Sequence, residues 1–417
     1  MHEFAYKKDQ LYCEGLPVKD LAEKFSTPLY VYSAKTVLDH FLKIKKAFAP
    51  LRPLICYSVK ANSNLSILKL LVDKGAGLDI VSGGELYRAN KIKCSPQKIV
   101  YASVGKTLKE IRDAIEQGIL MFNVESAPEL ERINDIAADL NRRVDIALRL
   151  NPDVSPKTHA YIKTAKKESK FGMEPDLVKD ILINRRCYPN LSIKGIHIHI
   201  GSQITQARPF VDAIKKVKAL IKEVKAQGVT LEYLNIGGGL GIIYDKERPQ
   251  TARMFAKKVL PLLKSISLKV ILEPGRFIVG NAGILVTKVL YVKNTIQKRF
   301  IIVDGAMNDL IRPSLYEAYH TIVPLSLSAK STNEIPKKAD VVGPICESGD
   351  FLGKDRDLDV KAQDYLAVLG AGAYGFVMSS NYNSRPRVAE VLVKGKEVKL
   401  IRKRETYKDL VAKEIVA

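Results

Sequence analysis

The chain is poor in the features that mark secreted, membrane-spanning or disordered proteins. It has five cysteines in 417 residues and no CxxC pair, which excludes a disulfide framework and favours free thiols in a reducing compartment. Its apolar runs are far shorter than the roughly 18 residues that a membrane span needs. The N-terminal MHEFAYKKDQ lacks the apolar core of a signal peptide. With 46% hydrophobic and 27% charged residues, we expect a globular cytoplasmic protein.

Acidic residues are scarce relative to basic ones. The 67 Lys and Arg against 45 Asp and Glu give a net charge of +22, which in some proteins indicates nucleic-acid or anionic-membrane partners. Here the lysines are spread along the chain with acids between them, and no RNP box or zinc-finger spacing is present. The pattern favours a solvated lysine surface. We therefore expect neither nucleic acid nor membrane as a partner.

Between about residues 30 and 275, short β-branched runs alternate with amphipathic stretches. The helical stretches include 64–74, 106–117, 125–140 and 208–227. Continuous apolar strands joined by helices indicate a parallel sheet that is buried on both faces. Eight such units predict a (β/α)8 barrel of the TIM type, with a doubly wound open sheet as the alternative from periodicity alone. The eight candidate strands are 54–59, 77–81, 98–102, 119–124, 144–150, 193–200, 231–236 and 268–272.

After residue 280 the helical period fades and turn-separated strands take over. This pattern predicts a C-terminal β-sandwich or small β-barrel domain. We place the barrel at 28–277, and the β-rich domain at 278–417 together with the N-terminal residues 1–27. The candidate strands of this second domain lie in 283–293, 299–306, 339–345, 364–371 and 388–401.

Chemically distinctive residues gather where the barrel strands end, which is where barrel enzymes place their active sites. Each residue type also has an ordinary structural explanation: a lysine that extends to solvent, a histidine that packs in the core, or glycines that form a tight turn. The functional interpretations are a desolvated amine that bonds a carbonyl, and glycine N–H groups that bind a phosphate. The candidates are Lys60 at the end of strand 1, His197, His199 and Ser202 at the end of strand 6, Gly237, Gly238 and Gly239 at the end of strand 7, and Glu273 and Arg276 at the end of strand 8.

Taken together, these residues describe pyridoxal 5'-phosphate chemistry. The amine would hold the aldehyde, an imidazole would stack on the ring, and a carboxylate would pair with the pyridinium N–H. The HxH pair could also begin a zinc site, but no third ligand stands at convincing spacing. We expect no metal.

A second glycine motif resembles a dinucleotide-binding fingerprint. Gly370, Gly372 and Gly375 form GxGxxG after an apolar strand. The segment that should form a helix is broken by asparagines and Pro386, and too few residues follow for further βαβ units. We therefore expect no dinucleotide site.

The sequence closely resembles the diaminopimelate decarboxylase family, pyridoxal phosphate enzymes of the alanine-racemase-like fold type. The resemblance spans nearly the whole chain in order. It rests on YSVKAN (57–62), GLDIVSGGEL (77–86), RLNPDVSPKTHAYIKT (149–164), KFG (170–172), GIHIHIGSQ (195–203), NIGGGLG (235–241), EPGR (273–276), DGAMNDLIRPSLYEAYH (304–320), CESGD (346–350) and GAGAYGFVMSSNYNSRPR (370–387).

The resemblance implies a role for each matching residue, in a homodimer with shared active sites. Lys60 would hold the cofactor, His199 would stack on it and Glu273 would face its ring nitrogen. The phosphate would lie against Ser202, Gly237, Gly238, Gly239 and the Gly275–Arg276 turn. Arg276, Arg312 and Tyr316 would receive the distal carboxylate of the substrate. Glu347 and the proton donor Cys346 would come from the other subunit, and Tyr374 would touch cofactor and substrate.

The implied reaction is decarboxylation of meso-2,6-diaminopimelate to L-lysine, the last step of lysine biosynthesis. The alternatives within this fold are ornithine- or arginine-type decarboxylases and carboxynorspermidine decarboxylase. CESGD and RPSLYEAYH favour diaminopimelate, because the rival substrates lack a distal amino-acid carboxylate of this kind. A racemase would use the same cofactor without releasing carbon dioxide.

Overall fold

The computed structural model describes residues 2–154, 170–327 and 338–416. Residues 155–164 of the RLNPDVSPKTHAYIKT motif lie outside these ranges. The chain divides into two compact units: His40–Ile242 with Arg248–Phe277, and Met1–Asp39 with Ile243–Glu247 and Ile278–Ala417. The barrel unit thus begins later than residue 28, because strand β4 (Leu29–Ser33) pairs with strands of the β-rich unit.

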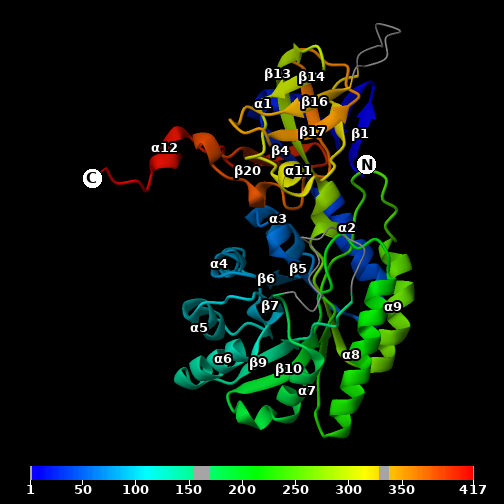
Figure 1. Ribbon diagram of the computed structural model, residues 1–417, viewed down its shortest axis with the longest axis vertical. Helices are drawn as coiled ribbons and strands as arrows, with labels where there is room; N and C mark the ends of the chain where they lie inside the picture. The colour runs from blue at the N-terminus through cyan, green and yellow to red at the C-terminus, as the bar shows by residue number, and fades with distance from the viewer. Residues whose placement is uncertain (1, 155–169, 328–337, 417) are drawn as a thin grey trace. The chain divides into compact units, whose positions relative to one another are not determined.

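The barrel unit has eight parallel strands in a closed ring, which confirms the predicted barrel over the open sheet (Figure 1). The last strand, β12, pairs with the first, β5, to close it. All eight predicted strands form, several shorter than expected. They are β5 (Leu54–Ser58), β6 (Gly77–Ile80), β7 (Ile99–Tyr101), β8 (Met121–Val124), β9 (Val144–Arg149), β10 (Leu191–His197), β11 (Tyr233–Asn235) and β12 (Lys269–Leu272).

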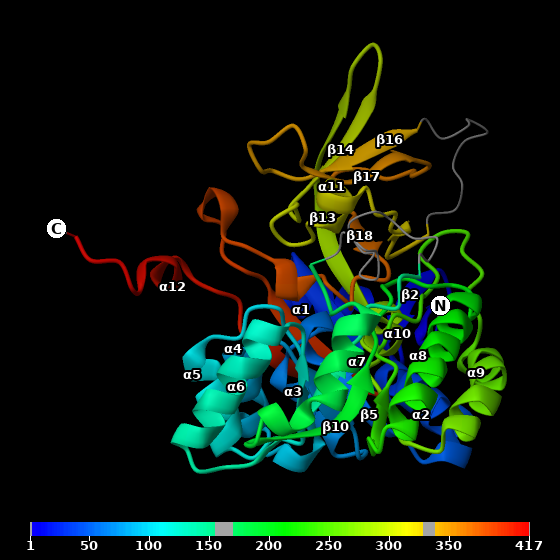
Figure 2. The ribbon, with the colours of Figure 1, turned by 60° about the horizontal axis from the view of Figure 1, so that its bottom comes forward.

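Helices surround the strand ring, and the polar residues between strands and helices explain where several begin (Figure 2). Asn64, Ser82, Thr107 and Ser126 each accept a hydrogen bond from a backbone N–H of the first turn, which stabilises that helix start. The helices are α2 (Ala34–Ala47), α3 (Leu65–Val72), α4 (Gly83–Lys91), α5 (Leu108–Glu116), α6 (Ala127–Asp139), α7 (Pro175–Ile183), α8 (Arg208–Ala226) and α9 (Ala252–Ile266).

The β-rich unit is built on a mixed nine-stranded sheet, so the predicted second domain is confirmed as β-rich. The long strand β13 (Gly283–Asn294) pairs with β4, β14 (Arg299–Val303) and β18 (Tyr365–Val368). The pairs β4–β19 and β14–β16 are parallel, and the others are antiparallel. The remaining strands of this sheet are β15 (Ile322–Pro324), β16 (Ala339–Val342), β17 (Phe351–Arg356), β19 (Ala389–Lys394) and β20 (Glu397–Arg402).

The N-terminal residues form a separate three-stranded sheet. The sheet is antiparallel and is followed by α1, and its apolar residues pack on the core of the larger sheet. Short helices complete the chain. These elements are β1 (Phe4–Lys7), β2 (Gln10–Cys13), β3 (Leu16–Pro17), α1 (Val18–Phe25), α10 (Arg276–Val279), α11 (Arg312–Tyr316) and α12 (Tyr407–Val411).

The glycines of the GxGxxG motif serve close packing. Gly370 has a φ of +68°, and a Cβ at this position would lie 3.3 Å from the ring of Tyr244. A Cβ on Gly372 would lie 2.0 Å from the carbonyl oxygen of Val279. Only two short 3₁₀ turns, Phe376–Met378 and Tyr382–Ser384, follow before the next strand. The motif therefore lacks the helix that a dinucleotide site requires.

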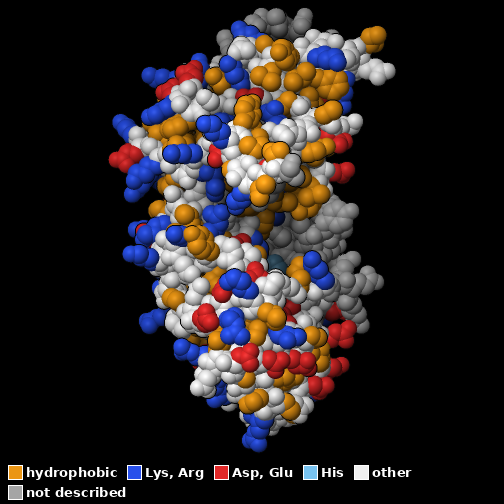
Figure 3. All heavy atoms as spheres, turned by 90° about the vertical axis from the view of Figure 1, so that its left-hand side faces the viewer, with side chains coloured by type: hydrophobic (Ala, Val, Ile, Leu, Met, Phe, Trp, Pro, Cys, Tyr) orange, Lys and Arg blue, Asp and Glu red, His pale blue; other side chains and the backbone are white. Residues whose placement is uncertain are grey.

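The surface has the exposed lysines, with acidic residues among them, that the sequence pattern predicted. Figure 3 shows Lys and Arg side chains over this face of the molecule, with Asp and Glu among them. All five cysteines are free thiols. Across the described residues, no helix has both the length and the apolar character that a membrane crossing requires.

Candidate active site

Lys60 lies against a buried carboxylate that the sequence did not single out. It follows β5 in a 3₁₀ turn, Val59–Ala61, and its Nζ lies 2.8 Å from Oδ2 of Asp79 on the neighbouring strand β6. The Asp79 side chain is fully buried and also accepts the Ser58 hydroxyl at 2.6 Å. Burial and the charge of Glu273 raise the pKa of Asp79, while Lys60 opposes the shift. The amine is thus held in one place at the carboxyl ends of the strands.

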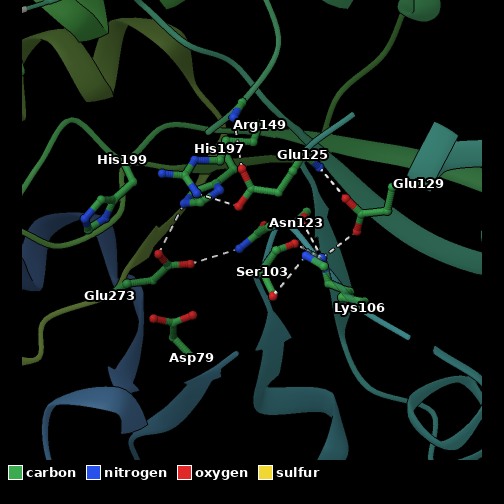
Figure 4. A network of polar contacts seen from close by, with 12 residues as sticks. Asp79, Ser103, Lys106, Asn123, Glu125, Glu129, Arg149, His197, His199 and Glu273 are labelled. Carbon is green, nitrogen blue, oxygen red and sulfur yellow. Dashed lines mark hydrogen bonds and ion pairs between the residues drawn. The ribbon is translucent and has the colours of Figure 1, made fainter. Parts of the chain in front are cut away.

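Glu273 is the centre of a buried polar network (Figure 4). Its Oε1 accepts hydrogen bonds from the amides of Asn235, at 2.5 Å, and Asn123, at 3.0 Å. Its Oε2 lies 3.2 Å from Nε2 of His197. Burial alone would raise the pKa of Glu273, but the contact with His197 and the charge of Lys60 lower it below its usual range. A buried carboxylate that stays ionised can stabilise a cation in the barrel mouth.

His199 has a different environment from His197. His199 lies beyond the end of β10, and its Nδ1 accepts the Gly238 N–H at 3.3 Å. Burial and the charges of Arg149 and Lys60 lower its pKa well below the usual value. His199 is therefore neutral at physiological pH, which suits stacking on a ring.

The glycine loop after β11 requires residues without side chains. Gly237 and Gly239 have φ values of +66° and +105°, and a Cβ on Gly238 would lie 2.0 Å from the Glu273 carbonyl oxygen. The N–H groups of Gly237 and Gly238 donate to Asn235 and His199. The loop is therefore a tight turn in which two of the three glycine N–H groups are held by side chains of the site.

Ser202 and Arg276 lie together beside this loop and offer donors for an anion. The Arg276 Nη2 lies 3.1 Å from the Ser202 Oγ, and Arg276 is 7% exposed. Gly275 lets the turn approach closely, because a Cβ there would lie 3.0 Å from the Cβ atoms of Ser58 and Ala61. A guanidinium and a hydroxyl suit a phosphate or carboxylate.

A second buried network supports the first (Figure 4). The Lys106 side chain is completely buried, and its Nζ lies 2.5 Å from Glu129. It also donates to the carbonyl oxygens of Ser103 and Asn123, at 3.0 and 3.1 Å. Because the Asn123 amide bonds Glu273, Lys106 fixes the backbone of a residue that orients the central carboxylate.

Five predicted site residues belong to the β-rich unit. Arg312 and Tyr316 are four residues apart on α11, whose first turn contains Pro313. Cys346 is exposed, and its N–H donates to Oδ1 of Asn383 at 2.8 Å. The other two are Glu347, whose Oε2 lies 3.4 Å from the Tyr382 hydroxyl, and Tyr374, whose φ is +56°.

Sequence reasoning missed several residues that complete these networks. Asp79, Asn123 and Asn235 lie inside the predicted apolar strands, near their carboxyl ends. A polar residue within a buried parallel strand was the available signal, because burial there requires a specific partner. In the β-rich unit, Tyr244 and His320 contact Arg312 and were also missed.

The barrel residues fit pyridoxal 5'-phosphate. Lys60 offers an amine, Glu273 an ionised buried carboxylate, His199 a neutral ring, and Ser202 with Arg276 an anion site. Among the residues that the structure describes, no cluster of three or more His, Cys, Asp or Glu could hold a metal ion.

Comparisons with known proteins agree with this cofactor. Residues 34–280 match the family model described as "Pyridoxal-dependent decarboxylase, pyridoxal binding domain". The chain is 52% identical to the diaminopimelate decarboxylase of Aquifex aeolicus, over 96% of this chain and 95% of that one.

Two solved structures of diaminopimelate decarboxylases complexed with L-lysine are also similar. The Helicobacter pylori enzyme has a TM-score of 0.90 and 40% identity, covering 95% of this chain and 98% of that one. The M. jannaschii enzyme has a TM-score of 0.94 and 38% identity, covering 100% and 98%. The chain therefore belongs to the diaminopimelate decarboxylase family of pyridoxal-dependent decarboxylases.

Proposed function

We propose that this chain is a carboxy-lyase that converts meso-2,6-diaminopimelate into L-lysine and carbon dioxide with pyridoxal 5'-phosphate as cofactor. The main support is the arrangement of Lys60 with Asp79 and of Glu273 with His197 at the carboxyl ends of the barrel strands. The chain is also 52% identical, over nearly its full length, to a diaminopimelate decarboxylase. The product matches the lysine in the two similar structures.

The barrel residues hold the cofactor. When bound, it supplies an aldehyde that bonds amines and a protonated ring that accepts the electron pair left when carbon dioxide departs. Lys60 would provide the amine for attachment, and Asp79 would position that amine. Glu273 would pair with the ring N–H, and neutral His199 would pack on the ring. The phosphate would be bound by Ser202, Arg276, Gly275 and the loop Gly237, Gly238 and Gly239.

The substrate carries an amino-acid group at each end, and the enzyme must distinguish them. The amino-acid group at the far end of the substrate binds to Arg312, Tyr316 and Glu347. Arg276 and Tyr374 complete the contacts with the substrate. Arg312 is 6% exposed, so its charge-assisted hydrogen bonds to a carboxylate are screened little by water. Ornithine and arginine offer no distal carboxylate to this group.

Cys346 donates the proton to the carbon that loses carbon dioxide, and it does so in the site of a second subunit. The thiol is exposed within its own chain, as this role requires. Leu315, Tyr319 and Tyr382 of the same unit are exposed large hydrophobic residues, which suits a homodimer interface in this region. The five free cysteines support a location in the reducing cytoplasm.

A substrate panel tests the proposal. Holoenzyme is incubated separately with meso-diaminopimelate, ornithine, arginine and carboxynorspermidine, and the products are measured by mass spectrometry. We expect turnover of meso-diaminopimelate to lysine and little product from the others. Preferential turnover of ornithine, arginine or carboxynorspermidine would overturn the proposal in favour of a related decarboxylase.

A further inference from the structure

Arg312 is held by two ring side chains that carry no role in the proposed mechanism. Its guanidinium carbon lies 4.6 Å from the ring centroid of Tyr244, and its Nη1 lies 3.2 Å from Nε2 of His320. The two rings meet edge to face, with centroids 5.1 Å apart. Tyr244 is in turn fixed by its carbonyl oxygen, which accepts the Thr321 hydroxyl at 3.2 Å.

The contacts of His320 define its tautomer. Its Nδ1 lies 2.8 Å from the carbonyl oxygen of Leu369, and a carbonyl oxygen can only accept, so Nδ1 carries the proton. A guanidinium can only donate, so Nε2 must hold the lone pair that faces Arg312. His320 is fully buried, and the neutral ring with the proton on Nδ1 is the form that satisfies both contacts.

The surrounding backbone is shaped to keep this arrangement. Leu369, whose carbonyl accepts the His320 proton, donates its own N–H to Thr321 at 2.8 Å. Gly370 packs on the rings, since a Cβ there would lie 3.3 Å from Tyr244 and 3.9 Å from Nδ1 of His320. The first glycine of the GxGxxG motif thus makes room for the two rings that hold Arg312.

We propose that His320 is a positioning residue that orients Arg312 for the distal carboxylate of the substrate. The inference rests on the proposed role of Arg312 and deepens it. His320 offers a neutral imidazole acceptor and Tyr244 an aromatic face, and these two contacts orient the guanidinium without adding a negative charge of their own.

The test compares two competitive inhibitors that differ in one group. L-Lysine keeps the amino-acid end that Arg312 would read, whereas 1,5-diaminopentane has no carboxylate. In holoenzyme with His320→Asn, which cannot offer an acceptor at the Nε2 position, we expect the inhibition constant of L-lysine and the KM for diaminopimelate to rise about tenfold. The inhibition constant of 1,5-diaminopentane and kcat should change far less.

Two further variants separate positioning from general damage. His320→Gln can place an amide oxygen near the Nε2 position, so it should recover part of the L-lysine affinity. Tyr291→Phe alters an exposed tyrosine of β13 that has no proposed role, and it should leave both inhibitors unaffected. Equal weakening of L-lysine and 1,5-diaminopentane in His320→Asn would overturn the inference.

Arg312→Ala shows which proposal fails. If Arg312→Ala weakens L-lysine selectively but His320→Asn does not, only the role of His320 is wrong. If Arg312→Ala shows no selectivity, the distal-carboxylate role of Arg312 itself is wrong. Nitrogen-15 NMR of histidine-labelled wild-type holoenzyme needs no variant: we expect His320 with a proton on Nδ1 only, and a proton on Nε2 would contradict the inference.

Discussion

The amine of Lys60 lies 2.8 Å from a carboxylate oxygen of Asp79, and that carboxylate is completely buried. The relationship follows from the barrel register, because Ser58 at the end of β5 pairs with Asp79 on β6 and Lys60 comes two residues later. A buried carboxylate that contacts an amine and the Ser58 hydroxyl fixes the position of both groups. Contacts within the protein therefore orient the Lys60 amine.

Glu273→Gln should leave the cofactor bound but slow decarboxylation about a hundredfold, because a neutral amide stabilises a ring cation poorly. Cofactor content is measured by absorbance, and kcat by lysine release. Glu116→Gln, on the exposed side of α5, is the matched control and should be active. A kcat close to that of the wild type in Glu273→Gln would remove Glu273 from this role.

Replacing Lys106 by Met should destabilise the protein by about 3–5 kcal/mol, because it leaves the Glu129 carboxylate buried without its ion-pair partner. The matched control is Lys109→Met: Lys109 pairs with Asp113 on the surface and is 82% exposed, so its loss should lower the free energy of unfolding far less than the loss of Lys106.

Urea unfolding measures the free energy of unfolding of Lys106→Met and of Lys109→Met. The double variant Lys106→Met, Glu129→Leu should recover part of the lost stability, because it removes both buried charges. Equal stability of Lys106→Met and Lys109→Met would contradict the assigned burial of this pair.

Much of the fold was predictable from local pattern, and part of the site was not. The apolar runs and the caps at Thr107 and Ser126 are local signals, so the barrel strands and their helices could be placed. Asp79, Asn123 and Asn235 gain their roles only when strands far apart in sequence converge near Glu273. The start of the barrel was placed too early because β4 is an apolar strand whose partners, β13 and β19, lie hundreds of residues away.

Asp309 should make stability depend on pH. Burial raises its pKa to about 7 from the ordinary 3.8. The folded protein therefore keeps a proton that the unfolded chain releases, and this stabilisation is present at low pH and lost as the pH rises through about 7. Asp309→Asn removes the titration, so the stability of the variant relative to the wild type should increase by about 3 kcal/mol from about pH 5 to about pH 8.

Unfolding midpoints of both proteins across this pH range are the measurement for Asp309. A difference that stays constant with pH would show that Asp309 titrates normally.

Mixing two inactive variants tests the proposed shared site. Lys60→Ala and Cys346→Ala proteins should each be nearly inactive. After subunit exchange, half the dimers are mixed and each carries one intact site of two, so activity should approach about a quarter of the wild-type value. No recovery, despite exchange shown by mass spectrometry, would mean that Cys346 serves its own subunit or is not the proton donor.

The most direct measurement is the yield of L-lysine and carbon dioxide from meso-diaminopimelate, made with wild-type holoenzyme, with Lys60→Ala, and with Lys69→Ala as an exposed-lysine control. The account predicts one lysine for each carbon dioxide in the wild type and in Lys69→Ala, and neither product in Lys60→Ala. Borohydride reduction followed by peptide mapping should place the cofactor on Lys60. Two results would contradict the account. One is a change in diaminopimelate stereochemistry without release of carbon dioxide. The other is a cofactor label on another lysine together with an active Lys60→Ala variant.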